Sequence, residues 1–269
     1  MENPIDNVES INFEEMVCEH KQYIFSLAYR LTGRREEAED LAQETFLSAW
    51  KSVSQLREKS AVLPWLRKIC VNAFLQKKRK RYEVMEISNY DIRQLEEEDR
   101  QLRLSSPSPT PEEEFLVDEA IQEFKDNCFT AMATRLSLEQ RVTFALVDVF
   151  GLNVVETAVL LNRSLSATKA LLHRARRNLN AFFGRYCQWV LPENACHCVA
   201  WLEFTDRCEA LRKEARRLNL ELPDFNDATY ARHSDPETLE KVLALFRNLP
   251  LCVPDEHWFE KVKENIKMG

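Results

Sequence analysis

The sequence predicts an all-α protein made of two small helical domains, a flexible linker between them and a small helical carboxyl-terminal extension. Only 4 of the 269 residues are glycine, and leucine, alanine, glutamate, lysine and arginine dominate the composition. These five residue types all favour helices. Apolar residues recur mostly three or four positions apart, which is the spacing of an amphipathic helix. The length exceeds that of a usual single domain, so several units are expected.

The first domain is expected over residues 11–82. Helices over 13–31 and 34–52 keep their apolar residues at helical spacing, and Gly33 between them is a typical signal for the end of the first helix. A third helix begins near Pro64, because proline suits the first turn, where a missing N–H is tolerated. These segments are expected to form one helical bundle.

A linker and a second domain follow. Residues 83–111 turn acidic, lose the helical periodicity and end in SSPSPTP, so we expect a flexible linker. The second domain is expected over 112–186. Three residue pairs have the spacing of a capping box and mark expected helix starts: Thr110 with Glu113, Ser137 with Gln140, and Asn153 with Glu156. Ser164 opens a last, basic helix after a tight turn in which Asn162 takes a left-handed conformation, and this arrangement predicts a helix-turn-helix.

Basic residues gather in two windows of a chain whose formal net charge is -7. Neither 59–82 nor 157–192 contains Asp or Glu, and both contain several Lys and Arg. Two separate basic windows are two candidate surfaces for a polyanion such as DNA. The alternative for both is a solvated basic helix face, and for the run at 77–81 also a targeting signal.

The last helix of the second domain has two different sides. One apolar stripe is expected to contain Leu165, Thr168, Leu172, Ala175 and Leu179. Another face is expected to present Lys169, His173, Arg176 and Asn180. A helix with an apolar back and a basic front suits the major groove, because the back packs on a partner helix while the front meets phosphates and base edges.

Two stretches of the chain resemble a known family. The sequence YIFSLAYRLTGRREEAEDLAQETFLSAW at 23–50, followed by LPWLRKICVNAFLQKKRKR at 63–81, resembles the second conserved region of bacterial extracytoplasmic-function sigma factors. These are group 4 members of the sigma-70 superfamily. The sequence LSLEQRVTFALVDVFGLNVVETAVLLNRSLSATKALLHRARRNL at 136–179 is similar to their fourth region. The resemblance covers about two-thirds of the chain, in the family's order, and stops before Cys187.

The resemblance implies a role for each matching segment of the first domain. The positions that dock core RNA polymerase in the family correspond to Asp40, Gln43, Glu44, Phe46, Leu47 and Trp50. Plain core packing is the alternative for the two aromatic members. The positions that capture and hold the minus-ten element of promoter DNA correspond to Ser54, Gln55, Arg57, Lys59, Arg67, Lys68, Asn72, Gln76, Lys77, Lys78, Arg79, Lys80 and Arg81. Holding an opened strand requires a basic groove and a pocket for an extruded base.

The same resemblance implies that the last helix of the second domain reads the minus-thirty-five element. The positions concerned are Ser164, Ser166, Ala167, Thr168, Lys169, His173, Arg174, Arg176 and Arg177. The sequence departs from the family pattern twice. Asn162 replaces the turn glycine, and Leu171 stands where the family usually has a basic or polar residue. Leu171 either widens the packing stripe or removes a contact to bases.

The carboxyl-terminal extension is expected over 187–269 as a third helical unit, with its last helices starting at Pro236 and Asp255. Its candidate metal ligands are Cys187, Cys196, Cys198 and Cys208. Four thiolates suit zinc or copper(I), although the spacing is not that of a standard zinc finger and buried free cysteines are the alternative. No cofactor is required by this interpretation.

Other function classes lack the residues that they need. The sequence has no glycine-rich phosphate loop, no HExxH and no recognisable nucleophile, so an enzyme is not expected. No apolar stretch is long enough for a membrane span, so we expect a soluble, cytoplasmic protein. The expected partners are core RNA polymerase and promoter DNA, with control by an anti-sigma factor or by the protein's own extension. The alternatives are a helix-turn-helix transcription regulator and a metal- or redox-sensing sigma factor controlled by its cysteine-rich tail.

Overall fold

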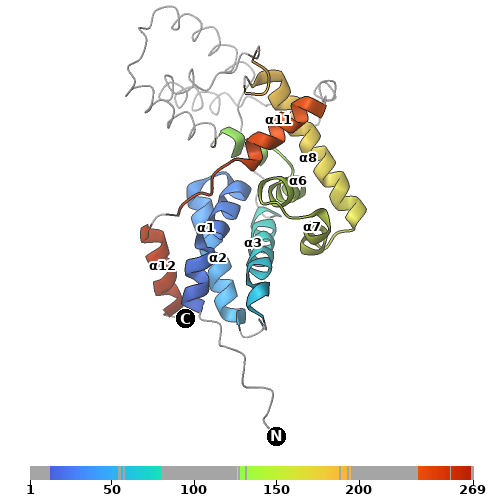
Figure 1. Ribbon diagram of the computed structural model, residues 1–269. Helices are drawn as coiled ribbons and strands as arrows, with labels where there is room; N and C mark the ends of the chain where they lie inside the picture. Colours follow the sequence, from blue (N-terminus) through green and yellow to red (C-terminus); the bar gives the residue numbers. More distant parts are fainter. Residues whose placement is uncertain are drawn as a thin grey trace, which may run out of the picture. The chain divides into compact units, whose positions relative to one another are not determined.

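The computed structural model describes residues 13–53, 56, 58–79, 126, 128–130, 132–187, 189–192, 194, 236–254 and 256–267. Within these ranges all the secondary-structure elements are helices, so the all-α prediction is confirmed (Figure 1). The predicted linker at 83–111 lies outside them. No helix in the described part of the chain is long and apolar enough to cross a membrane.

The chain divides into two compact units, and each is described by itself. Unit 1 comprises Met1–Tyr82 together with Pro250–Gly269, and unit 2 comprises Glu83–Leu249.

Unit 1 is built on a bundle of three long helices and a short 3-10 turn. They are α1 (Phe13–Thr32), α2 (Arg35–Ser52), η2 (Lys59–Ala61) and α3 (Val62–Arg79). The predicted glycine stop is confirmed, because Gly33 has φ 73° and its N–H donates to the Tyr29 carbonyl at 2.8 Å. Large apolar side chains with almost no exposure form the core, namely Ile24, Phe25, Leu27, Leu31, Leu41, Phe46, Leu66 and Phe74.

Unit 2 is a second helical bundle. Its helices are α6 (Leu138–Phe144), the π-helical turn η3 (Ala145–Val149), α7 (Val154–Leu161), α8 (Leu165–Tyr186) and α11 (Pro236–Arg247). Its core contains a group of aromatic rings. Phe183 lies 4.8 Å from Phe129 and 5.7 Å from Phe246 between ring centroids, and Phe144 meets Phe246 edge to face at 4.8 Å.

The local signals of the helix-turn-helix are present in α7 and α8. Asn153 and Glu156 form a reciprocal capping box, with distances of 2.8 and 3.2 Å between side-chain oxygens and backbone nitrogens. Asn162 ends α7 in the left-handed conformation, with φ 51° and ψ 48°. The Ser164 hydroxyl then accepts from the Ala167 N–H at 3.2 Å. Ser137 differs from the prediction, since its side chain makes no capping bond to α6.

The carboxyl-terminal helices differ from the expected third unit. α11 begins at Pro236, as predicted, but Val242, Leu243 and Phe246 complete the core of unit 2. The last helix, α12 (Glu256–Lys267), begins one residue after the predicted start and belongs to unit 1, where it packs on α2. Each helix has 12 residues, and a helix of this length needs a partner for its apolar face. Each finds that partner in one of the two predicted domains.

The left-handed turn residue can be tested by substitution. We expect Asn162→Ala to lower the free energy of unfolding of unit 2 by about 1 kcal/mol, because an alanine side chain is strained at positive φ. Asn162→Gly should retain the stability of the wild type. Urea denaturation followed by circular dichroism measures both, and equal stability of the alanine variant and the wild type would contradict the assigned role of the turn.

Candidate polymerase and nucleic-acid interfaces

The predicted polymerase-docking residues all lie on α2, but they do not all reach the surface. Asp40 is exposed, and Gln43, Glu44 and Leu47 are partly exposed. These four side chains share the outer side of the helix, since positions three, four and seven apart fall on one side. The structure corrects the prediction for Phe46, whose side chain is fully buried in the core of unit 1. Phe46 therefore supports this surface from below and cannot contact a partner directly.

Trp50 combines both of the interpretations given to it. Its ring packs edge to face on Phe13, with centroids 5.0 Å apart and an interplanar angle of 70°. The side chain nevertheless keeps 38% of its surface exposed. Trp50 thus lies at the rim of the predicted polymerase-docking surface. One aromatic contact holds its ring, and the other side of the ring is open to a partner.

The predicted minus-ten residues of α3 form an exposed row. Lys68, Asn72 and Gln76 are all exposed and follow each other at intervals of four residues, so they share one side of the helix. Sequence reasoning treated Trp65 only as a candidate buried residue and gave it no part in DNA binding. Trp65 lies on the same side, seven positions before Asn72, and is half-exposed. That spacing was the available signal. A partly exposed tryptophan beside basic and amide groups is a platform on which a base can stack.

Arg67 is held in place by an aromatic side chain from α1. Its Nε donates to the Tyr23 hydroxyl at 2.7 Å, and its guanidinium carbon lies 4.8 Å from the centre of the Tyr23 ring. Burial raises the pKa of Tyr23, and the charge of Arg67 partly opposes this rise. The phenol is therefore protonated at neutral pH. This pairing was missed because the two residues are 44 positions apart.

Lys77 links the two predicted surfaces of unit 1. Its ammonium group lies 2.8 Å from a carboxylate oxygen of Glu44. A lysine predicted to contact DNA therefore forms an ion pair with a glutamate predicted to dock polymerase. Both side chains are about half-exposed, and such a pair contributes little stability. The remaining predicted minus-ten contacts lie outside the described residues or have side chains outside the description: Ser54, Gln55, Arg57, Lys59, Lys78, Arg79, Lys80 and Arg81.

In unit 2, α8 presents a basic outer side. The exposed predicted residues are Ser166, Lys169, His173, Arg174 and Arg177, and Ser164 is the exposed cap residue. None of the four basic or imidazole side chains has a hydrogen-bond or ion-pair partner among the residues that the structure describes. Ala170 lies on the same side, four residues from Ser166 and from Arg174, and is also exposed. Sequence reasoning passed over Ala170 because alanine carries no polar group, yet its methyl group can contact a thymine methyl.

Arg176 is a correction to the predicted DNA contacts. Its guanidinium forms two hydrogen bonds to the carboxylate of Asp148, at 2.9 and 2.7 Å, and Asp148 is 1% exposed. These hydrogen bonds raise the pKa of Arg176, which stays charged. Arg247 of α11 adds a second, longer approach to the same carboxylate at 3.7 Å. A buried carboxylate requires a paired cation, so Arg176 satisfies Asp148 and is not free for phosphate.

Other positions of α8 also differ from the predicted division into two sides. Thr168 is fully buried and Ala167 half-buried, so the predicted base contact of Thr168 is wrong. Asn180 is buried, whereas Leu165 at the start of the helix is 41% exposed. Leu171 is 8% exposed. Its burial shows that it widens the packing stripe.

Among the described cysteines, Cys70 and Cys187 are buried, whereas Cys18 is exposed. Cys187 is 9% exposed and belongs to the core of unit 2. Cys196, Cys198 and Cys208 lie outside the described residues, so the predicted metal site stays a prediction. Within the description no group of three or more potential ligands comes together. Burial raises the pKa of Cys70 to about 12, so its thiol stays protonated at neutral pH.

Comparison with protein families matches two segments of the chain. Residues 16–83 match the model of Sigma-70 region 2, and residues 126–179 match the model of Sigma-70, region 4. The first match covers most of α1 and all of α2 and α3, and the second covers α6, α7 and most of α8. The helix-turn-helix and the exposed row of Lys68, Asn72 and Gln76 on α3 therefore both fall within matched segments.

Curated relatives support the same assignment. The chain is 29% identical over 184 residues to the ECF RNA polymerase sigma factor SigE of Mycolicibacterium smegmatis, covering 67% of this chain and 65% of that protein. It is 29% identical over 168 residues to SigG of Mycobacterium tuberculosis, covering 60% of this chain and 45% of that protein. It is 24% identical over 172 residues to SigW of Bacillus subtilis, covering 62% of this chain and 86% of that protein. The chain thus spans less than two thirds of SigE and of SigG.

The neighbouring bases Arg176 and Arg177 provide a matched test of the assignment in unit 2. We expect Arg176→Ala to lower the free energy of unfolding by about 2 kcal/mol, because it leaves the buried Asp148 with only the longer 3.7 Å ion pair to Arg247. Arg177→Ala should leave stability unchanged and weaken binding to double-stranded DNA, with a smaller dependence on salt. Denaturation and fluorescence-anisotropy titrations measure the two effects. Equal stability of the two variants would refute the structural role of Arg176.

Proposed function

We propose that this protein is a sigma factor of the extracytoplasmic-function class, which binds core RNA polymerase and directs it to promoter DNA. One observation carries the proposal. A segment matching region 2 and a segment matching region 4 occur in one chain in that order. Each carries exposed basic side chains on a helix that the resemblance assigns to DNA, including Lys68 on α3 and Lys169 on α8. The relatives named above are sigma factors of this class.

In this proposal unit 1 opens the duplex. The exposed row Lys68, Asn72 and Gln76 supplies a charge and two amide groups on one side of α3, and amides can hydrogen-bond base edges. Trp65 offers a stacking surface beside them. Arg67 is oriented by Tyr23 and contributes a positive charge at the edge of this row. Positive charge together with an aromatic surface is what single-stranded DNA requires.

Unit 2 contacts duplex DNA upstream in the same proposal. The outer side of α8 carries Lys169, His173, Arg174 and Arg177, and the helix is anchored from behind by its buried apolar stripe and by Arg176. A rigid helix with exposed basic side chains is suited to the major groove. Because Arg176 is not available to DNA, α8 has fewer phosphate-binding groups than the sequence suggested. We assign sequence discrimination to the amino-terminal half of α8.

Polymerase binding is assigned to the outer side of α2. Asp40, Gln43 and Leu47 are accessible there, and Trp50 lies at the rim. A conventional helix-turn-helix regulator has no need for this surface or for a second DNA-binding unit. The partners proposed are therefore core RNA polymerase and promoter DNA. Control by an anti-sigma factor and metal binding by the cysteine-rich tail stay predictions.

Reconstituted transcription tests the proposed function. Purified full-length protein added to bacterial core polymerase should yield transcripts that start at defined positions on promoter fragments, mapped by sequencing of their 5′ ends. Core polymerase alone is the control. Folded protein that neither binds core polymerase in a pull-down nor changes the start sites would refute the proposal.

Tyr23→Phe tests the positioning of Arg67. The variant keeps the aromatic ring beneath the guanidinium and loses only the hydroxyl that accepts its hydrogen bond. We expect about fivefold weaker open-complex formation by the holoenzyme, since a hydrogen bond contributes about 1 kcal/mol. The salt dependence should stay unchanged because the charge of Arg67 is retained. Arg67→Ala is the comparison and should reduce both; wild-type open-complex formation by Tyr23→Phe would contradict the positioning role.

A further inference from the structure

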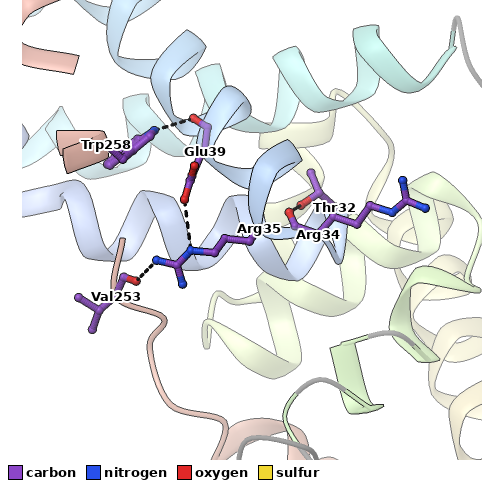
Figure 2. Close-up of polar contacts among 6 residues, drawn as sticks. All are labelled: Thr32, Arg34, Arg35, Glu39, Val253 and Trp258. Carbon is purple, nitrogen blue, oxygen red and sulfur yellow. Dashed lines mark hydrogen bonds and ion pairs between the residues drawn. The ribbon is translucent and has the colours of Figure 1, made fainter. Parts of the chain in front are cut away.

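The segment Pro250–Lys267 is fastened to unit 1 through its backbone. The Ser26 hydroxyl of α1 donates to the Cys252 carbonyl at 3.1 Å, and Arg30 of α1 donates to the Pro250 carbonyl at 2.8 Å. Arg35 of α2 donates to the Val253 carbonyl at 3.4 Å (Figure 2). Ser26 and Arg30 are almost fully buried beneath this segment and their neighbours, at 1% and 4% exposure. The surface of α1 and α2 is thus built to hold an extended stretch of chain.

The helix that follows adds an aromatic anchor. Trp258 of α12 is 5% exposed, and its indole N–H donates to the Glu39 carbonyl at 3.0 Å (Figure 2). Its ring lies 5.8 Å from the ring of Phe25 between centroids. Val262, one turn further along α12, is fully buried. The side-chain hydrogen bonds to backbone carbonyls before the helix, here called latches, and the apolar burial within the helix therefore hold the segment on unit 1.

The docking site adjoins the surface assigned to polymerase. Arg35 and Glu39, which contact the segment, lie one turn apart on α2, and Gln43 is the next position in the same row. Asp40 directly follows Glu39. A helix with its side chains is about 10 Å across, so α12 occupies space along the flank of α2 next to Gln43, and a partner that covers Gln43 has to fill part of the same space. Polymerase docking on the outer side of α2 and α12 docking on α2 therefore compete for one flank.

The docked segment has the character of a detachable element. A helix of 12 residues is too short to be stable alone in water, so α12 is helical because it is docked. Such peripheral elements open locally at a lower free energy than the core. If the partner binds only the open form, its apparent affinity falls by the fraction of molecules that are open.

We propose that Pro250–Lys267 is an intramolecular competitor of core RNA polymerase for the flank of α2 in unit 1. This inference rests on the proposed function and adds a means of regulation to it. The segment lowers the affinity of the free protein for polymerase, and polymerase binding displaces it. The competitor is part of the chain itself, so the effect does not depend on protein concentration.

Full-length Trp258→Ala tests the competition, with Lys261→Ala at an exposed position of the same helix as the matched control. Hydrogen exchange should become faster over 250–267 in Trp258→Ala and stay protected in α1 and α3. The dissociation constant for core polymerase should fall about tenfold in Trp258→Ala and stay unchanged in Lys261→Ala. An unchanged or higher dissociation constant, or unchanged exchange over 250–267, would overturn the proposal.

Ser26→Ala provides a second variant that removes one latch without leaving a large cavity. It should tighten polymerase binding in the same direction by about twofold to fivefold, since it removes one hydrogen bond. Weaker binding by this variant would overturn the competition even if Trp258→Ala disturbed the core. If wild type and variants bind polymerase equally, only the competition fails. If none of them binds, the proposed function fails and the competition with it.

Discussion

A short amphipathic helix has to bury its apolar face against a neighbour, and this constraint accounts for most of the structure. Helices of 7 to 22 residues gain little stability alone, and tertiary packing stabilises them. α1, α2 and α3 satisfy one another within unit 1, and α8 packs against α6 and α7 within unit 2. The two carboxyl-terminal helices obey the same constraint. α11 completes the core of unit 2, whereas α12 covers part of unit 1.

Packing also decides which basic side chains stay exposed to a polyanion. Asp148 is buried in the π-helical turn and requires a cation, and Arg176 supplies it from α8. Arg176, in the middle of a basic helix, is thereby paired within the protein, while Lys169, Arg174 and Arg177 stay exposed. In unit 1 the aromatic ring of Tyr23 plays a comparable part, because it orients Arg67 without neutralising its charge. The surfaces available to a polyanion are thus narrower and better defined than the basic windows of the sequence.

The sequence predicted local features well because their causes are local. The helix over Phe13–Thr32 ends at a glycine with positive φ, and the Asn153–Glu156 box and Asn162 turn define the helix-turn-helix within ten residues. Contacts between distant segments could not be predicted in this way. The partner of Arg176 lies 28 residues away, and the partner of Trp258 lies 219 residues away. Helical spacing placed Phe46 on a face, but only the packed bundle shows that this face is the core.

We propose that one chain opens DNA with unit 1 and contacts it upstream with unit 2, and does so only as part of a polymerase holoenzyme. Permanganate footprinting of a promoter identified by its mapped start site measures this directly, because permanganate oxidises unstacked thymines. The account predicts a single cluster of reactive thymines upstream of the start site, seen only when both the protein and core polymerase are present. Protection of duplex DNA by the protein alone, with no reactive thymines when polymerase is added, would contradict it and would indicate a conventional regulator.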